Sequence, residues 1–233
     1  MKKWMLGMVL AGMVPALAEA HLRNYLDTYG YETLARGHAE VEITNDRHEP
    51  DGGDAFWVNQ TEVEYGVTDR WTTALYGVFV DGQGFSAVKW ENRYRLKEKG
   101  VWPVNVALYG ELQKANGHKD VNEIEGKVIL SKDWDRWNLA VNPILELEEE
   151  RKPNGDKEWE LESGLAAGVS LRHGFGPRVT PGIEVLLAEK KSRITPGLYI
   201  DILPDVRLNL GAGIGLEKQA DDVIWKTLLE LEF

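Results

Sequence analysis

The stretch that decides the fold is a run of alternating residues near the carboxyl end: Val206-Arg207-Leu208-Asn209-Leu210-Gly211-Ala212-Gly213-Ile214-Gly215-Leu216-Glu217. Every second side chain is apolar, and the side chains between them are polar or absent. Successive side chains of a β-strand point to opposite faces of the sheet, so this period of two indicates a strand with one apolar face. The segment 137–148 repeats the pattern, with Trp137, Leu139 and Val141 on its apolar face.

Twelve such runs follow one another, separated by turn residues. We expect strands at 38–46, 55–67, 71–80, 85–96, 102–113, 121–132, 137–148, 158–171, 179–188, 192–202, 206–217 and 222–233. In the second run Asn59 and Thr61 share the apolar face, which indicates either a bulge or a shifted phase. The connections alternate between mostly short turns, such as 97–100, and longer polar loops. This pattern predicts an all-β fold, a transmembrane antiparallel up-and-down β-barrel of twelve strands.

The first twenty residues have the pattern of a secretory signal peptide. Lys2 and Lys3 precede an apolar stretch, and small residues follow it. Cleavage after Ala18 or after Ala20 fits this pattern, and we expect Ala20. The apolar stretch is too short to cross a bilayer comfortably as a helix. We therefore predict a signal peptide at 1–20, a periplasmic N-terminal segment at 21–37 and the barrel at 38–233.

A water-soluble β-barrel would alternate as well, so the surroundings of the apolar face must be argued separately. Aromatic residues gather at the ends of the predicted strands, where a bilayer meets water. The expected membrane-interface girdle consists of Tyr65, Trp71, Tyr94, Trp102, Trp137, Trp159, Trp225 and Phe233. We therefore expect the apolar face to contact outer-membrane lipid and lipopolysaccharide, and the other face to line the lumen.

The last strand carries a resemblance to a known signature. Trp225, Thr227, Leu229, Leu231 and Phe233 alternate and end on an aromatic residue, which resembles the carboxyl-terminal strand of bacterial outer-membrane proteins. The resemblance implies location in the bacterial outer membrane and recognition by the barrel-assembly machinery. The segment 64–71, EYGVTDRW, is similar to the strand-turn-strand of porin-like families that include phenol-degradation-pathway transporters.

The inward register holds seventeen acidic and seven basic residues. The candidate lumen-lining residues are Glu62, Glu64, Lys89, Glu91, Arg93, Arg95, Glu111, Glu123, Glu125, Lys127, Glu146, Glu160, Glu162, Glu184, Arg193, Asp201, Arg207, Lys226 and Glu230. Acidic rings in a pore favour cations, so we expect a passive porin-like channel for small solutes with a mild cation preference. The alternative is a non-conducting structural or surface-interaction barrel that acts through its outer loops.

Small residues interrupt this inward face at Gly164, Ala166, Gly168, Gly197, Gly211, Gly213 and Gly215. The favoured interpretation is that they let the sheet curl. The other interpretation is that they leave room for residues 22–37, whose Tyr25, Tyr29 and Tyr31 would fold into the lumen as a plug.

Composition and motifs argue against several other functions. The net charge of −11 argues against nucleic acid, which requires a basic surface. The chain has no cysteine, so it has no disulfide and no thiolate ligand for a metal. It also has no His-x-Ser pair that would place a base beside a nucleophile on one strand face. We expect no enzymatic activity, no cofactor and no metal site.

Overall fold

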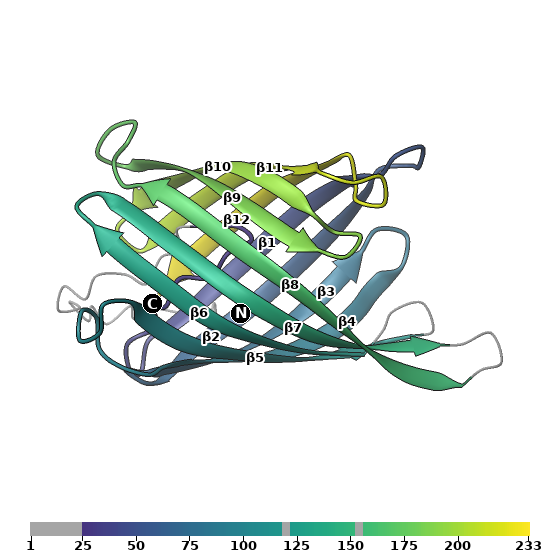
Figure 1. The fold of residues 1–233 in the computed structure, drawn as a ribbon, viewed down its shortest axis with the longest axis horizontal. Coiled ribbons are helices and arrows are strands. Elements are labelled where there is room, and N and C mark those ends of the chain that lie inside the picture. The colour runs from purple at the N-terminus through teal and green to yellow at the C-terminus, as the bar shows by residue number, and fades with distance from the viewer. Residues whose placement is uncertain (1–24, 118–121, 152–155) are drawn as a thin grey trace, which may run out of the picture.

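The computed structural model describes residues 25–117, 122–151 and 156–233, and these form one closed barrel of twelve antiparallel strands (Figure 1). The strands are β1 (Ala39–Glu49), β2 (Phe56–Thr68), β3 (Trp71–Val80), β4 (Gly84–Arg95), β5 (Asn105–Ala115), β6 (Glu123–Trp134), β7 (Trp137–Arg151), β8 (Lys157–Leu171), β9 (Val179–Ala188), β10 (Arg193–Leu203), β11 (Val206–Gly215) and β12 (Val223–Glu232). Each strand pairs with its neighbours in sequence, and β1 pairs with β12. The predicted fold class is therefore confirmed. The expected signal peptide lies outside the described residues.

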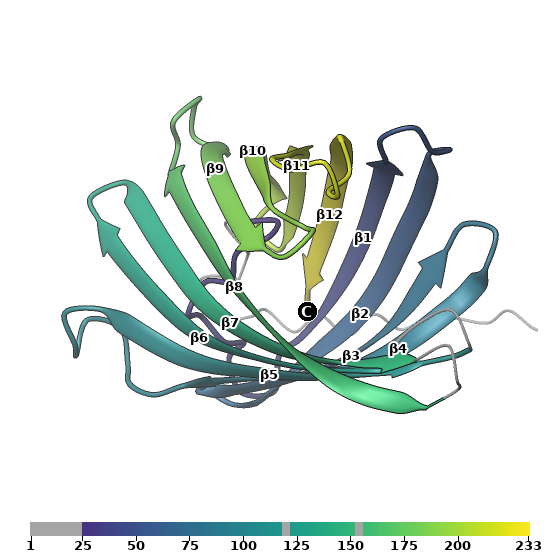
Figure 2. The same ribbon diagram turned by 45° about the vertical axis from the view of Figure 1, so that its right-hand side comes forward.

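The two ends of the barrel differ. We call the end that holds the start of β1 and the end of β12 the terminal end, and the opposite end the loop end. In Figures 1 and 2 the tilted strands run between these ends, and the β7–β8 hairpin projects beyond the rest at the loop end. It projects because β8 pairs with β9 only from Gly164 onward. Within the described ranges, no helix is long and apolar enough to cross a membrane.

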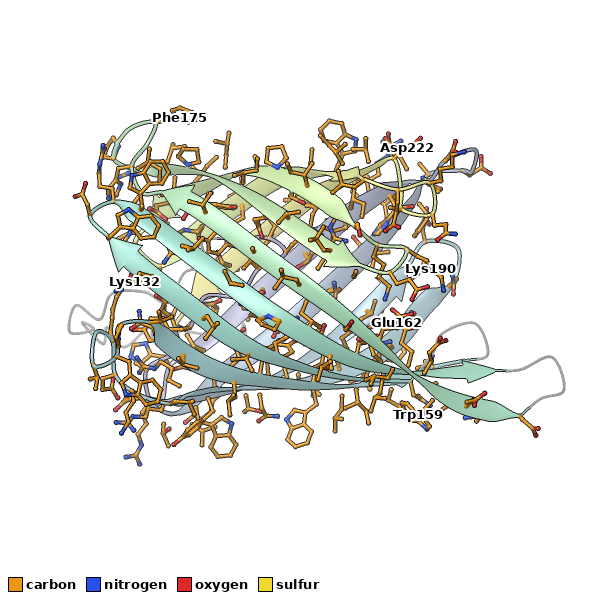
Figure 3. All side chains as sticks on the ribbon, viewed as in Figure 1. Lys132, Trp159, Glu162, Phe175, Lys190 and Asp222 are labelled. Atoms are coloured by element: carbon orange, nitrogen blue, oxygen red, sulfur yellow. The ribbon has the colours of Figure 1, made fainter. Side chains whose placement is uncertain are left out.

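The outer surface is apolar across the middle of the strands, and the charged side chains of the same strands point inward. Leu75, Trp90 and Leu108 are exposed, whereas Glu64 and Glu91 are buried. Figure 3 shows side chains projecting from the outside of the barrel along its strands. A barrel in water has the opposite arrangement, so this surface is one that hydrocarbon would solvate. The eight aromatic residues named for the girdle are all exposed on the outside: Tyr65, Trp71, Tyr94, Trp102, Trp137, Trp159, Trp225 and Phe233.

The second strand alternates without interruption where it pairs with the first strand. Asn59 and Thr61 lie in an unbroken register between β1 and β2, so neither a bulge nor a shifted phase is needed there. The irregularity of β2 lies at its end, where the pairing with β3 shifts between Gly66 and Thr68. The outer face of this strand therefore carries two neutral polar side chains.

The fifth strand begins later than the sequence predicts. The alternation predicts a strand from Trp102, but β5 begins at Asn105, and Trp102 lies in the connection 96–104. Pro103 has no backbone N–H to give to a ladder, which explains why pairing starts after it. The connection accordingly runs well beyond the short turn expected at 97–100.

Candidate functional site: the lumen and its inner segment

Residues 25–37 lie inside the barrel and cross its lumen. They make no regular strand, yet Tyr25, Tyr31 and Leu34 are almost fully buried. Apolar side chains of a polar segment become buried only when another surface covers them, and here that surface is the inner wall of the barrel. We call residues 25–37 the inner segment.

Glu184 of β9 holds the inner segment by its backbone. Its carboxylate accepts hydrogen bonds from the N–H groups of Leu26, Asp27 and Thr28, at 2.7, 2.8 and 2.7 Å. The hydroxyl of Tyr199 donates a further bond of 3.0 Å to the same carboxylate. Successive backbone N–H groups form a concave anion site, and the charge strengthens each bond. Glu184, expected to face solute, is therefore engaged by the chain itself.

Tyr29 links the inner segment to two walls of the barrel. On β7, the side-chain amide of Asn142 accepts from the Tyr29 N–H at 2.7 Å and donates to its carbonyl at 3.1 Å. Toward β4 the Tyr29 hydroxyl donates to Glu91 at 3.2 Å, and its ring packs against Tyr109 of β5 with centroids 4.8 Å apart. The ammonium of Lys127 lies 4.6 Å from the centre of the Tyr29 ring, a cation–π contact. The segment thus spans the lumen.

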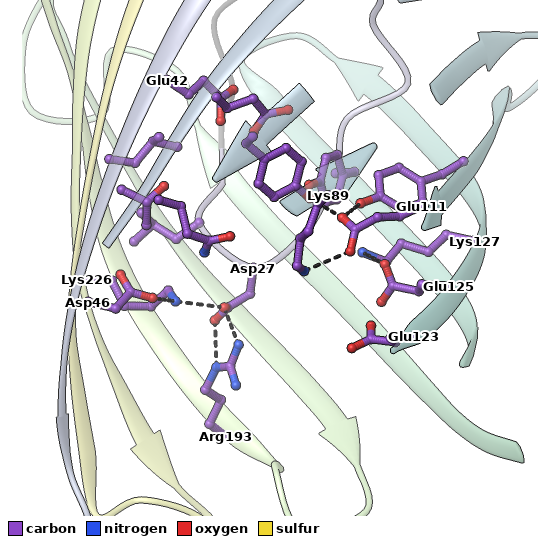
Figure 4. A pocket seen from close by; sticks show the side chains of 18 residues that line it. Asp27, Glu42, Asp46, Lys89, Glu111, Glu123, Glu125, Lys127, Arg193 and Lys226 are labelled. Carbon is purple, nitrogen blue, oxygen red and sulfur yellow. Dashed lines mark hydrogen bonds and ion pairs between the residues drawn. The ribbon is translucent and has the colours of Figure 1, made fainter. Parts of the chain in front are cut away.

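Asp27 is the centre of an ion cluster on the other side of the lumen (Figure 4). Its carboxylate accepts from the Arg193 guanidinium at 2.5 Å and from the Thr195 hydroxyl at 2.7 Å, and the Lys226 ammonium lies 3.4 Å away. Lys226 also pairs with Asp46 of β1. Burial alone would raise the pKa of Asp27, but Lys226 and Arg193 outweigh it and hold that pKa below its ordinary value.

The inner segment leaves the lumen at the terminal end, beside the turn between β2 and β3. The Leu34 N–H donates to the Thr72 hydroxyl at 2.8 Å, and the Thr33 hydroxyl donates to the Asp69 carbonyl at 2.9 Å. At Gly66, a Cβ atom would lie 2.1 Å from the carbonyl oxygen of residue 35, so only glycine allows the chain to pass here.

Two of the small residues on the inward face make room for the inner segment. A Cβ atom at Gly168 would lie 2.5 Å from the Tyr25 ring, and one at Gly211 would lie 2.4 Å from Leu26. At Gly197 and Gly213 the nearest atoms belong to the barrel's own side chains. The less favoured of the two sequence interpretations therefore holds at Gly168 and Gly211.

We expect Gly168→Ala to displace Tyr25. The ring of Tyr25 is buried, and its hydroxyl donates to the Asn138 side chain at 2.6 Å, so it has little freedom to move aside. Limited proteolysis of the folded protein should cut the inner segment faster in this variant than in the wild type. Gly126→Ala is the control, because a Cβ atom there meets nothing within 4 Å. Equal cleavage rates in the two variants would contradict the packing described above.

Two adjoining cavities occupy the lumen beyond the inner segment, toward the loop end. Their volumes are about 250 and 280 Å³. Both are lined by Asp27, Lys89, Glu123, Glu125, Lys127 and Arg193, and Figure 4 shows the first of them. Glu42 and Glu62 line the first cavity, and Glu162 and Lys191 line the second.

A row of carboxylates follows the hydrogen-bond register around the inner wall. Each member faces the next across a strand pair, in the order Glu232, Glu40, Glu64, Ala74, Glu91, Glu111, Glu125, Glu146 and Glu162. Only Ala74 lacks a carboxylate. The strands tilt against the barrel axis, so a row that follows the register climbs along the barrel. It starts near the terminal end at Glu232 and ends near the loop end at Glu162. We call this row the carboxylate ladder.

The candidate lumen residues are buried or half-buried, with the exception of Glu160. Glu160 is exposed because it lies on the projecting part of β8, which has no β9 partner. All seven basic members are in ion pairs, and these pairs are Lys89–Glu111, Arg93–Glu64, Arg95–Glu98, Lys127–Glu125, Arg193–Asp27, Arg207–Asp201 and Lys226–Asp46. The positive charges of the inner wall are thus already matched by carboxylates.

Sequence reasoning missed three participants. Asp27 and Asn142 bind within the lumen, but no strand pattern marks the first, and the second is a neutral residue among many. Asp46 lies within the predicted first strand, 38–46, and in phase with Glu40 and Glu42, so the inward register already contained it although it was not among the candidate residues.

A closed antiparallel barrel with an apolar outside and charges within is the architecture of a transmembrane barrel of the bacterial outer membrane. Solved structures agree. The NanC porin matches with a TM-score of 0.60 and 12% identity, covering 83% of this chain and 98% of that one. The KdgM porin, solved in complex with disordered oligogalacturonate, matches with a TM-score of 0.61 and 10% identity, covering 83% of this chain and 99% of that one. An outer membrane channel from Pseudomonas putida F1 matches with a TM-score of 0.60 and 12% identity, covering 90% of this chain and 100% of that one.

These likenesses show the fold. No protein-family description matches the sequence, and no curated protein does. The neighbours named above are porins and channels by their descriptions, not enzymes.

Proposed function

We propose that this barrel is a passive channel of the outer membrane for small cationic or neutral solutes, with the terminal end in the periplasm. The carboxylate ladder is the observation that carries the proposal. Its members Glu111, Glu125, Glu146 and Glu162 line the two cavities and offer a cation a succession of oxygen ligands toward the loop end. Closely spaced sites of this kind permit both entry and exit. The expected acidic lumen and its cation preference follow from the same row.

The charge of the inner wall also bears on the class of solute. The KdgM porin is described with oligogalacturonate, which is a chain of acidic sugars. In this chain the seven basic candidates are matched by carboxylates, and further carboxylates such as Glu123 and Glu162 line the cavities. Like charges repel within a low-dielectric wall, so a polyanion would be disfavoured here. A cation or an uncharged solute suits this lumen better.

We further propose that the inner segment narrows the channel from the periplasmic side as a plug. Support comes from its contacts with opposite walls: Glu184 on β9 and Glu91 on β4 both bind it. A fully closed lumen would favour the second candidate, a structural or surface-interaction barrel. The adjoining cavities favour the channel, because they leave space lined by charged side chains that a solute can enter from the lumen.

Planar-bilayer recording in a potassium chloride gradient tests the proposal. We expect discrete conductance steps and a reversal potential with the sign of potassium selectivity. The double variant Glu125→Gln/Glu162→Gln should move the reversal potential toward zero, because it removes two carboxylates of the ladder and leaves Lys127 without its 2.7 Å partner.

Glu98→Gln is the matched control, because Glu98 lies in the connection 96–104 at the terminal end and outside the cavities. This variant should keep the wild-type reversal potential. Anion selectivity in the wild type would overturn the proposed cation preference. An absence of steps in both the wild type and a variant without the inner segment would favour the structural barrel.

A further inference from the structure

The strands β12, β1 and β2 bring six glutamates face to face near the terminal end. Glu40 lies opposite both Glu232 and Glu64, and one step further along the strands Glu42 lies opposite both Glu230 and Glu62. Like charges placed directly across a strand pair destabilise a sheet. Since the side chains of both rows face the interior, the register itself concentrates negative charge here.

The positive charge nearby is smaller. Arg93 pairs with Glu64 and also with Glu91, at 2.9 Å from the latter. Arg207 lies opposite Glu230 in the register and pairs with Asp201 at 2.5 Å. Two guanidinium groups therefore face seven carboxylates when Glu91 is counted with the six glutamates above.

Glu40 is the member of the cluster whose carboxylate is buried without a hydrogen bond from the described residues. Its side chain is 0% exposed, and within the described part of the chain neither of its carboxylate oxygens accepts a hydrogen bond. Glu62 also has one oxygen without a hydrogen bond there. A buried carboxylate without a hydrogen bond is costly, and it is retained where a cation or a proton compensates it.

The geometry fits a calcium ion. Oxygens of Glu40, Glu42 and Glu230 lie within 4.8 Å of one another, and so do oxygens of Glu42, Glu62 and Glu64. Calcium binds carboxylate oxygens at about 2.3–2.6 Å, so two ligands of one ion can be about 5 Å apart. Glu42 and Glu62 also line the first cavity, which gives an ion a path from the lumen to the buried Glu40.

We propose that this cluster binds a divalent cation of the calcium class, with Glu40, Glu42 and Glu230 as one set of ligands and Glu62 beside them. The ion neutralises the repulsion across β12, β1 and β2 and so stabilises the seam where the barrel closes. The inference concerns binding and stability, and it holds whether or not the lumen conducts.

The test is calcium binding to the full-length mature protein, refolded in detergent without lipopolysaccharide. Isothermal titration with calcium chloride gives the affinity, and thermal melting with calcium or with a chelator at neutral pH gives the stabilisation. The wild type should bind calcium and melt at a higher temperature in its presence. Glu40→Gln should weaken binding by about tenfold or more, because it removes a charged ligand. Without calcium the same variant should melt above the wild type, because it removes a repelling charge.

Glu123→Gln is the control. Glu123 belongs to a second group of carboxylates with Glu125 and Glu146, but Lys127 and Lys191 pair with members of that group. This variant should keep the calcium shift, and a loss of the shift would place the ion there instead. If Glu40→Gln does not fold, Glu42→Gln should show the same weakening.

Protons are the competing explanation. A wild-type melting temperature that is unchanged by calcium, and that rises only as the pH is lowered, would show that protonated glutamates fill the cluster and would overturn the proposal.

Discussion

Deletion of residues 25–36 should raise the single-channel conductance several-fold. The inner segment occupies the lumen across its width, from Glu184 on one wall to Glu91 on another, and its removal leaves space that water and ions fill. A barrel of twelve strands is wider than the eight-strand kind that side chains can fill, so the emptied lumen should stay open. Planar-bilayer recording of the refolded variant is the measurement.

A point variant tests the plug without removing any residue from the chain. Asp27→Ala removes the carboxylate that Arg193 and Lys226 share, and two buried cations then lose a partner. We expect frequent transitions to the open level of the deletion variant. Arg36→Ala is the control, because the Arg36 side chain is exposed and the backbone N–H that donates to Asp69 is kept in this variant. If the deletion variant conducts no better than the wild type, the inner segment is not a plug.

The contribution of Asp27 to holding the plug should be insensitive to mild acid. The pKa of Asp27 lies below its ordinary value of 3.8 because Lys226 and Arg193 outweigh the effect of burial. For a carboxyl group with a lowered pKa, the stabilisation is present above the ordinary pKa and is lost as the pH falls through the lowered one. The difference in open-level transitions between the wild type and Asp27→Ala should therefore stay constant from about pH 7 to about pH 4 and shrink only in stronger acid.

The strands could be predicted because every second side chain of each strand faces lipid and is therefore mostly apolar. Alternation such as that from Val206 to Gly215 is readable in a single strand, and each strand repeats it. The ends of strands are harder to predict, because a turn leaves no period. Pro103 kept residues before Asn105 out of β5, and pairing continued past residue 46 to Glu49 in β1.

The contents of the lumen could be predicted only in part. The inward phase identified Glu184 and Arg193, because each belongs to an alternating strand. Their partner Asp27 belongs to a segment without a period, and its binding depends on contacts with residues more than 150 positions away in the sequence. The carboxylate ladder could not be predicted without the strand pairing, because a list of inward glutamates does not reveal that Glu40 faces Glu64.

Leu75→Arg should lower the free energy of unfolding by about 2–4 kcal/mol, the cost of arginine near the middle of a bilayer. Leu75 lies in the middle of β3 with its side chain 58% exposed, paired with Val63 and Trp90 across its two neighbouring strands. In a membrane this exposure is to hydrocarbon, which cannot solvate a guanidinium group. Urea unfolding in lipid vesicles gives the change directly.

Leu203→Arg is the matched control for this prediction. The substitution is the same and the Leu203 side chain is also 58% exposed, but Leu203 is the last residue of β10, next to a turn at the terminal end. An arginine there can reach water, so the cost should be about 0–1 kcal/mol. The two variants differ in depth alone. Equal and small costs would place the outer face of the barrel in water, whereas a large cost at Leu75 alone requires a layer of hydrocarbon around the middle of the strands.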